Sequence, residues 1–371
     1  MTEYYIFIFI LILILLLAEV TAKKGFQGLS IKRETVSYSA HEGESFKISI
    51  IIENNKWLPV SFILITEKLP MELEVFEEEN LVNSGESNYH ITKLNIRGHE
   101  RVRRNYSIRA SKRGTYLLRE VKAAIGDAFG LNTNDRDFED YVELLVYPRA
   151  LDLKQLEFNT TSFQGDSIIK RWIYKDPLYI KGIREYNVED RMKDIHWKSS
   201  LKMNRLMVKD YDYTAEMELM IIFNVECGEP YYSSIDAKAI ERGIALAAAL
   251  SKQSIKEGVP VGLWCNSQLI SYGGEAAEEI VPALNSLKHI MELCARIDYT
   301  PRLSFNEYLM EKSKNFNKNT TYVIVADFLN EESIAIISRL ARNGFIIKLI
   351  DISTKSKLTA IKGIEKAVYN K

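Results

Sequence analysis

The hydrophobic pattern of this 371-residue chain changes partway along, and that change constrains the fold more than any other feature. In residues 29–148 apolar side chains recur at every second position, whereas from residue 218 onwards short apolar runs alternate with stretches of helical periodicity. A period of two indicates antiparallel strands with one buried face, and alternating strands and helices indicate a parallel sheet covered by helices. The sequence therefore predicts an all-β domain followed by an α/β domain.

The all-β domain is predicted over residues 25–150. Its clearest alternation is formed by Phe46, Ile48, Ile50, Ile52 and, after an Asn54-Asn55 turn, by Val60, Phe62 and Leu64. Further strands are expected at residues 89–96, 101–110, 116–124 and 141–147, between turn signals that contain Gly, Asn or Ser. About seven short strands in roughly 120 residues are typical of a β-sandwich of immunoglobulin-like architecture.

The α/β domain is predicted over residues 151–371. Strands are expected at residues 218–225, 259–265, 320–327 and 345–352, and helices at residues 234–257, 276–295, 305–314 and 330–343. This order predicts a doubly wound α/β fold, in which ligands bind beyond the carboxyl ends of the strands. Asn224, Glu226 and Asp327 therefore form the predicted upper rim of the sheet.

The N-terminus carries an unbroken apolar run at residues 4–18, which residues 20–22 extend past Glu19. At ~1.5 Å per residue this run is short but sufficient for a ~30 Å hydrocarbon layer, so a transmembrane anchor is predicted over residues 1–22. Lys and Arg follow the run and are absent before it, which favours a single-pass cell-membrane protein with cytoplasmic soluble domains. A cleaved signal peptide is the alternative, because Val20-Thr21-Ala22 resembles a cleavage site.

Composition argues against two kinds of site. The net charge of −1 gives no general attraction to nucleic acid. Cys227, Cys265 and Cys294 form no C-x-x-C pair and lie in or beside apolar runs, so we interpret them as reduced core residues. Basic residues gather at residues 97–113, but charges interleaved along strands are more typical of a solvated face than of a patch for anionic lipid or nucleic acid.

One segment, residues 184–198, holds a dense set of opposite charges around Trp197. It resembles the signature of the family called domain of unknown function 58. The resemblance extends to Arg113-Gly114-Thr115-Tyr116, to residues 127–131 and to Val146-Tyr147-Pro148, in the order that the family shows. It implies an N-terminal membrane region, a β-sandwich and a von Willebrand factor A-like domain that contains the signature at residues 182–202.

The chain departs from the family pattern at two signature positions. Glu189 stands where the family usually has Gly, and Lys193 stands where it has Arg. Family members are often encoded beside MoxR-type AAA+ ATPases, so the resemblance implies an adaptor or substrate partner in a chaperone-like assembly.

The candidate site residues of the signature share polar or aromatic chemistry: Arg184, Tyr186, Asp190, Lys193, His196, Trp197 and Lys198. In a structural interpretation, Asp190 pairs with Arg184 or Lys193, and Trp197 covers the edge of the α/β sheet. In a functional interpretation, Arg184 and Lys198 hold an acidic group of a partner. A lone His such as His196 is more often hydrogen-bonded structure than a catalytic base.

A metal site is the other candidate. A von Willebrand A-like domain with a working metal-ion-dependent adhesion site presents Asp-x-Ser-x-Ser after its first strand, which supplies hard oxygen ligands. This chain has Asn224-Val225-Glu226-Cys227-Gly228 instead, with Asp327 at the later acidic position. So few oxygen donors seldom hold Mg²⁺, and no cofactor is expected.

These patterns predict a non-catalytic, membrane-tethered interaction or adaptor protein that works with a MoxR-type AAA+ ATPase. No P-loop, dinucleotide fingerprint, H-E-x-x-H or G-x-S-x-G motif occurs. The alternative is a metal-dependent ligand-binding protein or hydrolase that uses Asp327, Glu226 and His196.

Overall fold

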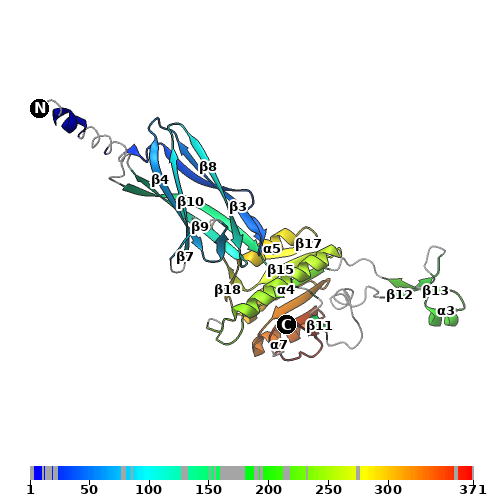
Figure 1. The fold of residues 1–371 in the computed structure, drawn as a ribbon. Coiled ribbons are helices and arrows are strands. Elements are labelled where there is room, and N and C mark those ends of the chain that lie inside the picture. The colour runs from blue at the N-terminus through cyan, green and yellow to red at the C-terminus, as the bar shows by residue number, and fades with distance from the viewer. Residues whose placement is uncertain are drawn as a thin grey trace. The chain divides into compact units, whose positions relative to one another are not determined.

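The chain divides into two compact units, shown in the computed structural model of Figure 1. The first unit is Met1–Arg149 with Ile270–Glu275, and the second is Ala150–Leu269 with Ala276–Lys371. The structure describes residues 4–10, 12, 19, 24–76, 81–84, 87–126, 133–149, 151, 153, 156–158, 180–187, 192, 195–211, 218–230, 233–272, 276–354 and 358–369.

The prediction of an N-terminal membrane helix is wrong for the residues that the structure describes. Residues 4–10, 12 and 19 are helical. No helix in the described part of the chain is long and apolar enough to cross a membrane. Residues 1–3, 11, 13–18 and 20–23 of the predicted anchor lie outside the described residues.

The first unit is a sandwich of two β-sheets. Their strand orders are β1-β3-β8-β5 and β2-β10-β9-β4-β7-β6, and all neighbours are antiparallel except β2 and β10. One apolar core joins the inner faces, with Phe46 and Ile48 from one sheet and Ile63 and Ile65 from the other. The strands are β1 (Leu29–Thr35), β2 (Ser39–His41), β3 (Ser45–Asn54), β4 (Val60–Pro70), β5 (Leu73–Val75), β6 (Leu81–Ser84), β7 (Ser87–Ile96), β8 (Arg101–Ala110), β9 (Gly114–Gly126) and β10 (Thr133–Tyr147).

The inward face of β4 differs from the sequence prediction. Val60 is buried, but the next buried residues are Ile63 and Ile65, whereas Phe62 is exposed. The pairing of β4 with β7 is irregular between Val60 and Ile63. An extra residue in a strand moves every later side chain to the opposite face, so the simple alternation predicted after Val60 fails.

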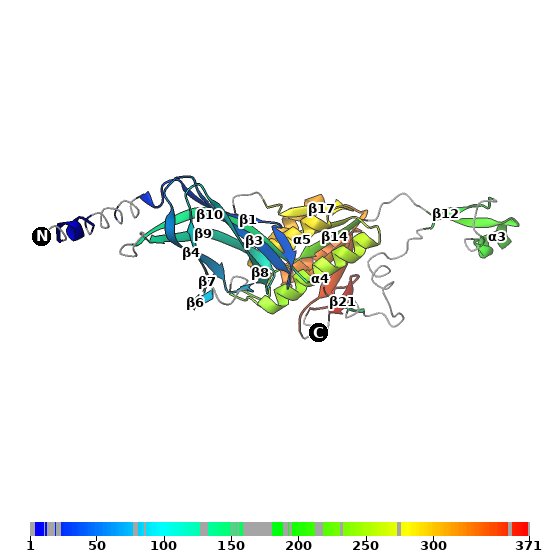
Figure 2. The ribbon, with the colours of Figure 1, turned by 45° about the horizontal axis from the view of Figure 1, so that its top comes forward.

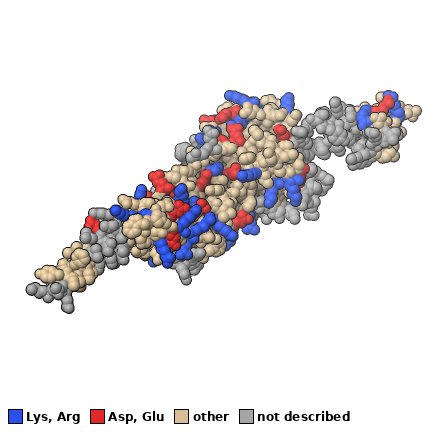
Figure 3. Space-filling model, turned by 90° about the horizontal axis from the view of Figure 1, so that it is seen from above, with Lys and Arg blue, Asp and Glu red and all other residues tan. Residues whose placement is uncertain are grey.

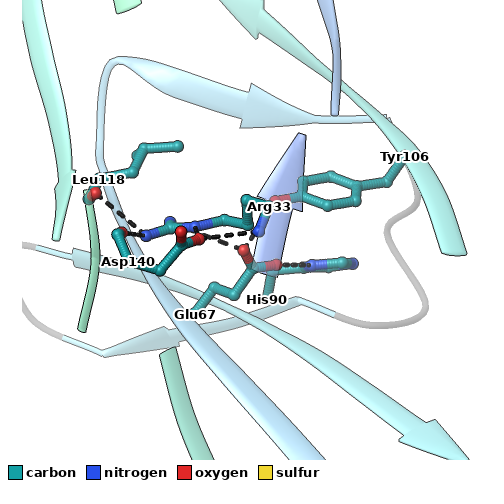
Figure 4. A network of polar contacts seen from close by, with 6 residues as sticks. All are labelled: Arg33, Glu67, His90, Tyr106, Leu118 and Asp140. Atoms are coloured by element: carbon teal, nitrogen blue, oxygen red, sulfur yellow. Dashed lines mark hydrogen bonds and ion pairs between the residues drawn. The ribbon is translucent and has the colours of Figure 1, made fainter. Parts of the chain in front are cut away.

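A charged side chain, Arg33, lies buried inside the sandwich (Figure 4). Its Nε donates to Oδ2 of Asp140 at 2.9 Å, and its Nη2 donates to the carbonyl oxygen of Leu118 at 3.0 Å. Its Nη1 lies 3.7 Å from Oε1 of Glu67, a carboxylate whose side chain is 0% exposed. A guanidinium removed from water is tolerable only with such partners.

Glu67 connects Arg33 to two aromatic rings (Figure 4). Its Oε2 lies 3.0 Å from Nδ1 of His90, and its Oε1 accepts a 2.8 Å hydrogen bond from the Tyr106 hydroxyl. Burial, and then the adjacent Glu67 carboxylate, raise the pKa of Tyr106 well above its usual value, so this hydroxyl keeps its proton and donates. We call Arg33, Glu67, His90, Tyr106 and Asp140 the buried charge network.

The surface of the sandwich carries both signs of charge in close alternation, as Figure 3 shows for the visible face. Arg101 pairs with Glu53 at 3.0 Å, and Arg103 pairs with Glu34 at 2.8 Å. These ion pairs agree with the interpretation that the basic residues at 97–113 belong to a solvated face.

The second unit is built on a seven-stranded sheet with the order β11-β21-β20-β19-β14-β15-β17. The five inner strands are parallel, while the edge strands β11 and β17 run antiparallel to their neighbours. Two short pairs, β12 with β13 and β16 with β18, lie outside it. The strands are β11 (Leu156–Phe158), β12 (Ile180–Glu185), β13 (Met207–Tyr211), β14 (Glu218–Phe223), β15 (Val261–Cys265), β16 (Ser267–Leu269), β17 (Glu279–Ala283), β18 (Ile297–Pro301), β19 (Thr320–Ala326), β20 (Ile346–Asp351) and β21 (Glu365–Tyr369).

Helices cover both faces of this sheet. Figures 1 and 2 show α4 across one face, where its Gly243 approaches the ring of Phe223. On the other face, α6 and α7 share a core with Ile222 of β14 and Ile324 of β19. The helices are α3 (Trp197–Met203), α4 (Ala237–Lys256), α5 (Leu287–Arg296), α6 (Phe305–Lys312) and α7 (Glu331–Arg342), with a 3₁₀ turn at Ser313–Asn315.

The predicted fold class needs correction in this unit as well. A helix was predicted over residues 276–295, but Glu279–Ala283 is the edge strand β17 and only Leu287–Arg296 is helical. The sheet is therefore mixed, and the described elements of the whole chain are mostly strands. Ile280, Val281 and Pro282 explain the strand, because β-branched residues favour extended backbone and Pro is tolerated at a sheet edge.

None of the three cysteines, all of which are described, forms a disulfide. Cys265 and Cys294 are buried, as predicted, and Cys227 is half-buried. Burial raises the pKa of the Cys227 thiol to about 11, so it remains protonated at neutral pH and is a poor nucleophile.

Candidate functional site

The family-like signature forms a small lobe of its own. β12 and β13 pair antiparallel, with Arg184 opposite Val208 and Glu185 opposite Met207, and α3 lies between them in the chain. Ile195 forms a bridge to Val208, and both side chains are buried together with Met207. We call residues 180–187 and 195–211 the signature lobe.

His196 fixes the start of the lobe's helix. Its Nδ1 accepts a 3.1 Å hydrogen bond from the backbone N–H of Ser199, which makes it the N-cap of α3. The hydroxyl of Ser200 donates to the His196 carbonyl at 3.1 Å and accepts the Met207 N–H at 2.9 Å. Asn204 ends the helix in the left-handed region, with φ 50°. His196 therefore holds the backbone at the start of α3, and its Nδ1 is engaged in this hydrogen bond.

The charged signature residues stay at the surface of the lobe where they are described. Arg184 donates to the carbonyl oxygen of Glu185 at 3.1 Å, the Tyr186 N–H donates to the Leu206 carbonyl at 3.0 Å, and Lys198 is exposed. Asp190 and Lys193 lie outside the described residues, so the predicted pairing of Asp190 remains a prediction.

Large apolar side chains are exposed on the same lobe. Trp197 is 60% exposed and Leu201 is 83% exposed, and they lie one helical turn apart on α3. The predicted cover of the α/β sheet edge by Trp197 stays a prediction. Other exposed apolar residues of the segment are Ile183, Met192, Met203 and Leu206.

The predicted rim residue Asn224 follows β14, and its side chain forms hydrogen bonds with backbone groups of two loops. Its Nδ2 donates to the carbonyl oxygen of Phe328 at 2.9 Å, and its Oδ1 accepts the Glu226 N–H at 3.0 Å. The structure thereby ties the loop after β14 to the loop after β19. A further buried amide, Asn266, accepts the Val225 N–H at 2.9 Å through Oδ1. Its place directly after the buried strand β15 was an available signal that the sequence analysis missed.

Glu226 is 3% exposed, and its Oε1 accepts the backbone N–H of Phe305 at 2.8 Å, at the start of α6. Asp327, half-buried, follows β19. No group of three or more His, Cys, Asp or Glu side chains suited to a metal ion occurs among the described residues. Asn224 thus holds two loops together, and Glu226 holds the start of α6. The oxygen atoms that these described side chains and Asp327 offer do not fit the ligand set of a divalent cation.

Stability should depend on pH through Glu226. Burial is the main factor that raises the pKa of this carboxyl from its usual 4.5. The folded state therefore keeps the proton to higher pH than the unfolded chain, and stability falls as pH rises from about 4.5 through the folded pKa. Gln at this position still accepts the Phe305 N–H but carries no charge. We therefore expect the thermal midpoint of Glu226→Gln, relative to that of the natural protein, to increase as pH rises through this window.

Glu226→Ala is the matched control, because it removes the acceptor as well as the charge. It should lower stability by about 1 kcal/mol relative to Glu226→Gln at every pH. Thermal midpoints recorded in parallel for the three proteins check both statements. Parallel curves for Glu226→Gln and the natural protein would refute the role of the buried charge.

Comparison with known proteins covers the two units unequally. Residues 182–361 match the profile of the family described as protein of unknown function DUF58. The uncharacterized protein YeaD of Bacillus subtilis (strain 168) is 20% identical over 227 residues, which are 60% of this chain and 52% of YeaD. The chain therefore spans about half the length of that relative.

Solved structures resemble about a third of the chain. A cohesin of the archaeon Archaeoglobus fulgidus has 17% identity and a TM-score of 0.23, and covers 32% of this chain and 90% of its own. The CARDB domain of the PF1109 protein of Pyrococcus furiosus has 11% identity and a TM-score of 0.21, and covers 32% and 86%. Scores at this level carry no argument about function.

The matched profile includes most of the signature lobe and the strands of the sheet from β14 to β20 with their helices. The match over residues 182–361 and the distant relative YeaD support the assignment of this chain to the DUF58 family of proteins of unknown function.

Proposed function

We propose that this protein is a non-catalytic interaction protein and that the signature lobe binds a partner protein. The observation that carries the proposal is the pair of neighbouring exposed side chains, Trp197 and Leu201, on α3. Contiguous exposed apolar residues are a mark of protein-binding surfaces, and Trp is among the residues that dominate binding energy at interfaces.

The energy available from this surface is considerable. Burying ~100 Å² of the Trp197 ring at about 25 cal/mol per Å² contributes about 2.5 kcal/mol. Lys198 and Lys202 flank the apolar pair on the same short helix and are exposed. A partner segment with an apolar centre and acidic flanks is the complement of this arrangement.

The proposed partner is a MoxR-type AAA+ ATPase, acting with this protein as its adaptor in a chaperone-like assembly. The support is the resemblance to the DUF58 family, together with the frequent encoding of such ATPases beside members of that family. The roles found for His196, Asn224 and Glu226 in holding backbone agree with a function without catalysis.

Leu201→Asp and Trp197→Ala should each weaken binding of the full chain to the MoxR-type ATPase of the same genome. A buried interface anchor costs about 2 kcal/mol or more when truncated, which is about a 30-fold rise in Kd. Titration of the purified ATPase, with and without ATP, measures the Kd of each variant.

Trp57→Ala is the matched control, because Trp57 is also strongly exposed, at 78%, but lies in the sandwich unit. It should leave the Kd unchanged. Equal losses for Trp57→Ala and Trp197→Ala, or the absence of binding by the natural protein in every nucleotide state, would refute the proposal.

A further inference from the structure

The sandwich unit holds a cavity of about 500 Å³ that is lined by residues of β7 and β8. β5 pairs with β8 from Val75 opposite Ile108 to Leu73 opposite Ala110, and the cavity residues 103–106 of β8 precede this part of the strand. The volume suits a small organic ligand.

Three basic side chains line the cavity. Lys93 of β7 and Arg103 and Arg104 of β8 all line it, and none of its described lining residues is Asp or Glu. Arg103 is neutralised by Glu34 at 2.8 Å. Arg104 lies in phase with the buried Tyr106 along β8, so it belongs to the inner face of the strand. The local field therefore favours an anion.

The innermost wall is formed by His90, which is 2% exposed and also lines the cavity. Its Nδ1 faces Glu67 at 3.0 Å, and its ring lies 4.4 Å from that of Tyr106. The contact with Glu67 fixes the orientation of the ring. Within the described residues Nε2 has no hydrogen-bond partner, which leaves it for a ligand.

We propose that this cavity binds the phosphate group of a small phosphorylated molecule. Arg104 and Lys93 supply the charge, Thr92 adds a hydroxyl to the same lining, and His90 presents Nε2. Polar groups of four kinds on two strands suit a tetrahedral dianion, which accepts from several directions, better than a planar carboxylate. The volume left beyond the phosphate takes the organic part. This site is separate from the signature lobe.

Calorimetric titration of the full chain with inorganic phosphate and with glycerol 3-phosphate tests the proposal, against sodium chloride of equal ionic strength. Arg104→Gln should raise the Kd for both ligands by about tenfold, the loss of one charge-assisted contact. Arg109→Gln is the matched control, because Arg109 is an exposed Arg of the same strand that does not line the cavity. It should leave the Kd unchanged.

A second readout places the ligand in the cavity. The chain has five His, so the imidazole ¹⁵N resonances resolve individually, and phosphate should shift Nε2 of His90 in the natural protein but not in Arg104→Gln. Vesicles with phosphatidic acid form a further arm. Binding to vesicles that Arg104→Gln weakens identifies a lipid headgroup as the source, and binding only of soluble phosphates identifies a free metabolite.

Three outcomes would overturn the assignment. They are tighter binding of citrate than of either phosphate, equal effects of Arg104→Gln and Arg109→Gln, and an unmoved His90 resonance at saturating phosphate.

Discussion

Replacing Glu67 by Ala should lower the free energy of unfolding of the sandwich unit by about 3–5 kcal/mol. The side chain is 0% exposed, and it lies 3.7 Å from Nη1 of Arg33 while bonding His90 and Tyr106. Removing the carboxylate leaves a buried guanidinium short of one counter-charge and leaves the Tyr106 hydroxyl without its acceptor. Hydrogen exchange of β3 and β8 peptides, read by mass spectrometry, measures the loss within this unit.

Glu34→Ala is the control for that experiment, because it also removes the carboxylate of a Glu and Arg pair. The pair of Glu34 with Arg103 is 2.8 Å long, but both side chains are more than half exposed. Water solvates either partner alone, so we expect a loss of at most about 1 kcal/mol. If the two variants lost equal stability, burial would not be the source of the effect of Glu67.

Gly243→Ala should destabilise the second unit by about 2–3 kcal/mol, opposite in sign to the effect that helix propensity predicts. In an exposed helix this change gains about 1 kcal/mol. Here a Cβ atom would lie 2.8 Å from Cζ of Phe223 and 2.8 Å from Cδ1 of Ile352, and both of these side chains are buried in the core. Either α4 or the sheet must shift, which is the cost of overpacking.

Lys252→Ala on the exposed side of α4 provides the comparison. It also introduces Ala into this helix, and it should change the stability by less than about 0.5 kcal/mol. Hydrogen exchange of the β14 and α4 peptides measures both variants. A Gly243→Ala protein as stable as the natural one would mean that α4 lies farther from the sheet than described.

Patterns confined to one segment predicted the elements well. Strands β14, β15, β19 and β20 and helices α4 and α7 lie where their apolar periodicity places them. The error at β17 has a tertiary cause. Gly262 of β15 has no side chain, and a Cβ there would lie 2.5 Å from the Ile280 carbonyl oxygen. The close approach of β17 thus depends on a residue about twenty positions earlier, although Pro282 was a local warning against a helix.

The candidate site was predicted in part. The signature was recognisable as a segment, and its Trp was named, but periodicity does not say whether an amphipathic ring faces a partner or the protein's own sheet. The buried charge network was missed altogether. The sequence signal for this network was a charged residue at a position where the alternation of the strand predicts a buried side chain. Arg33 has this position, two residues after Ile31 and four after Leu29. The bulge after Val60 concealed the same signal at Glu67.

The sequence by itself determined the order of strands and helices, because hydrophobic periodicity and turn residues act over a few neighbours along the chain. Only the tertiary structure decided which polar groups are buried and which apolar groups remain outside. Arg33 meets Asp140 across 107 positions of sequence, and Leu201 remains exposed on a helix whose neighbours Ile195 and Val208 are buried. Burial and electrostatic pairing depend on which surfaces the folded backbone brings together, and no local pattern contains that information.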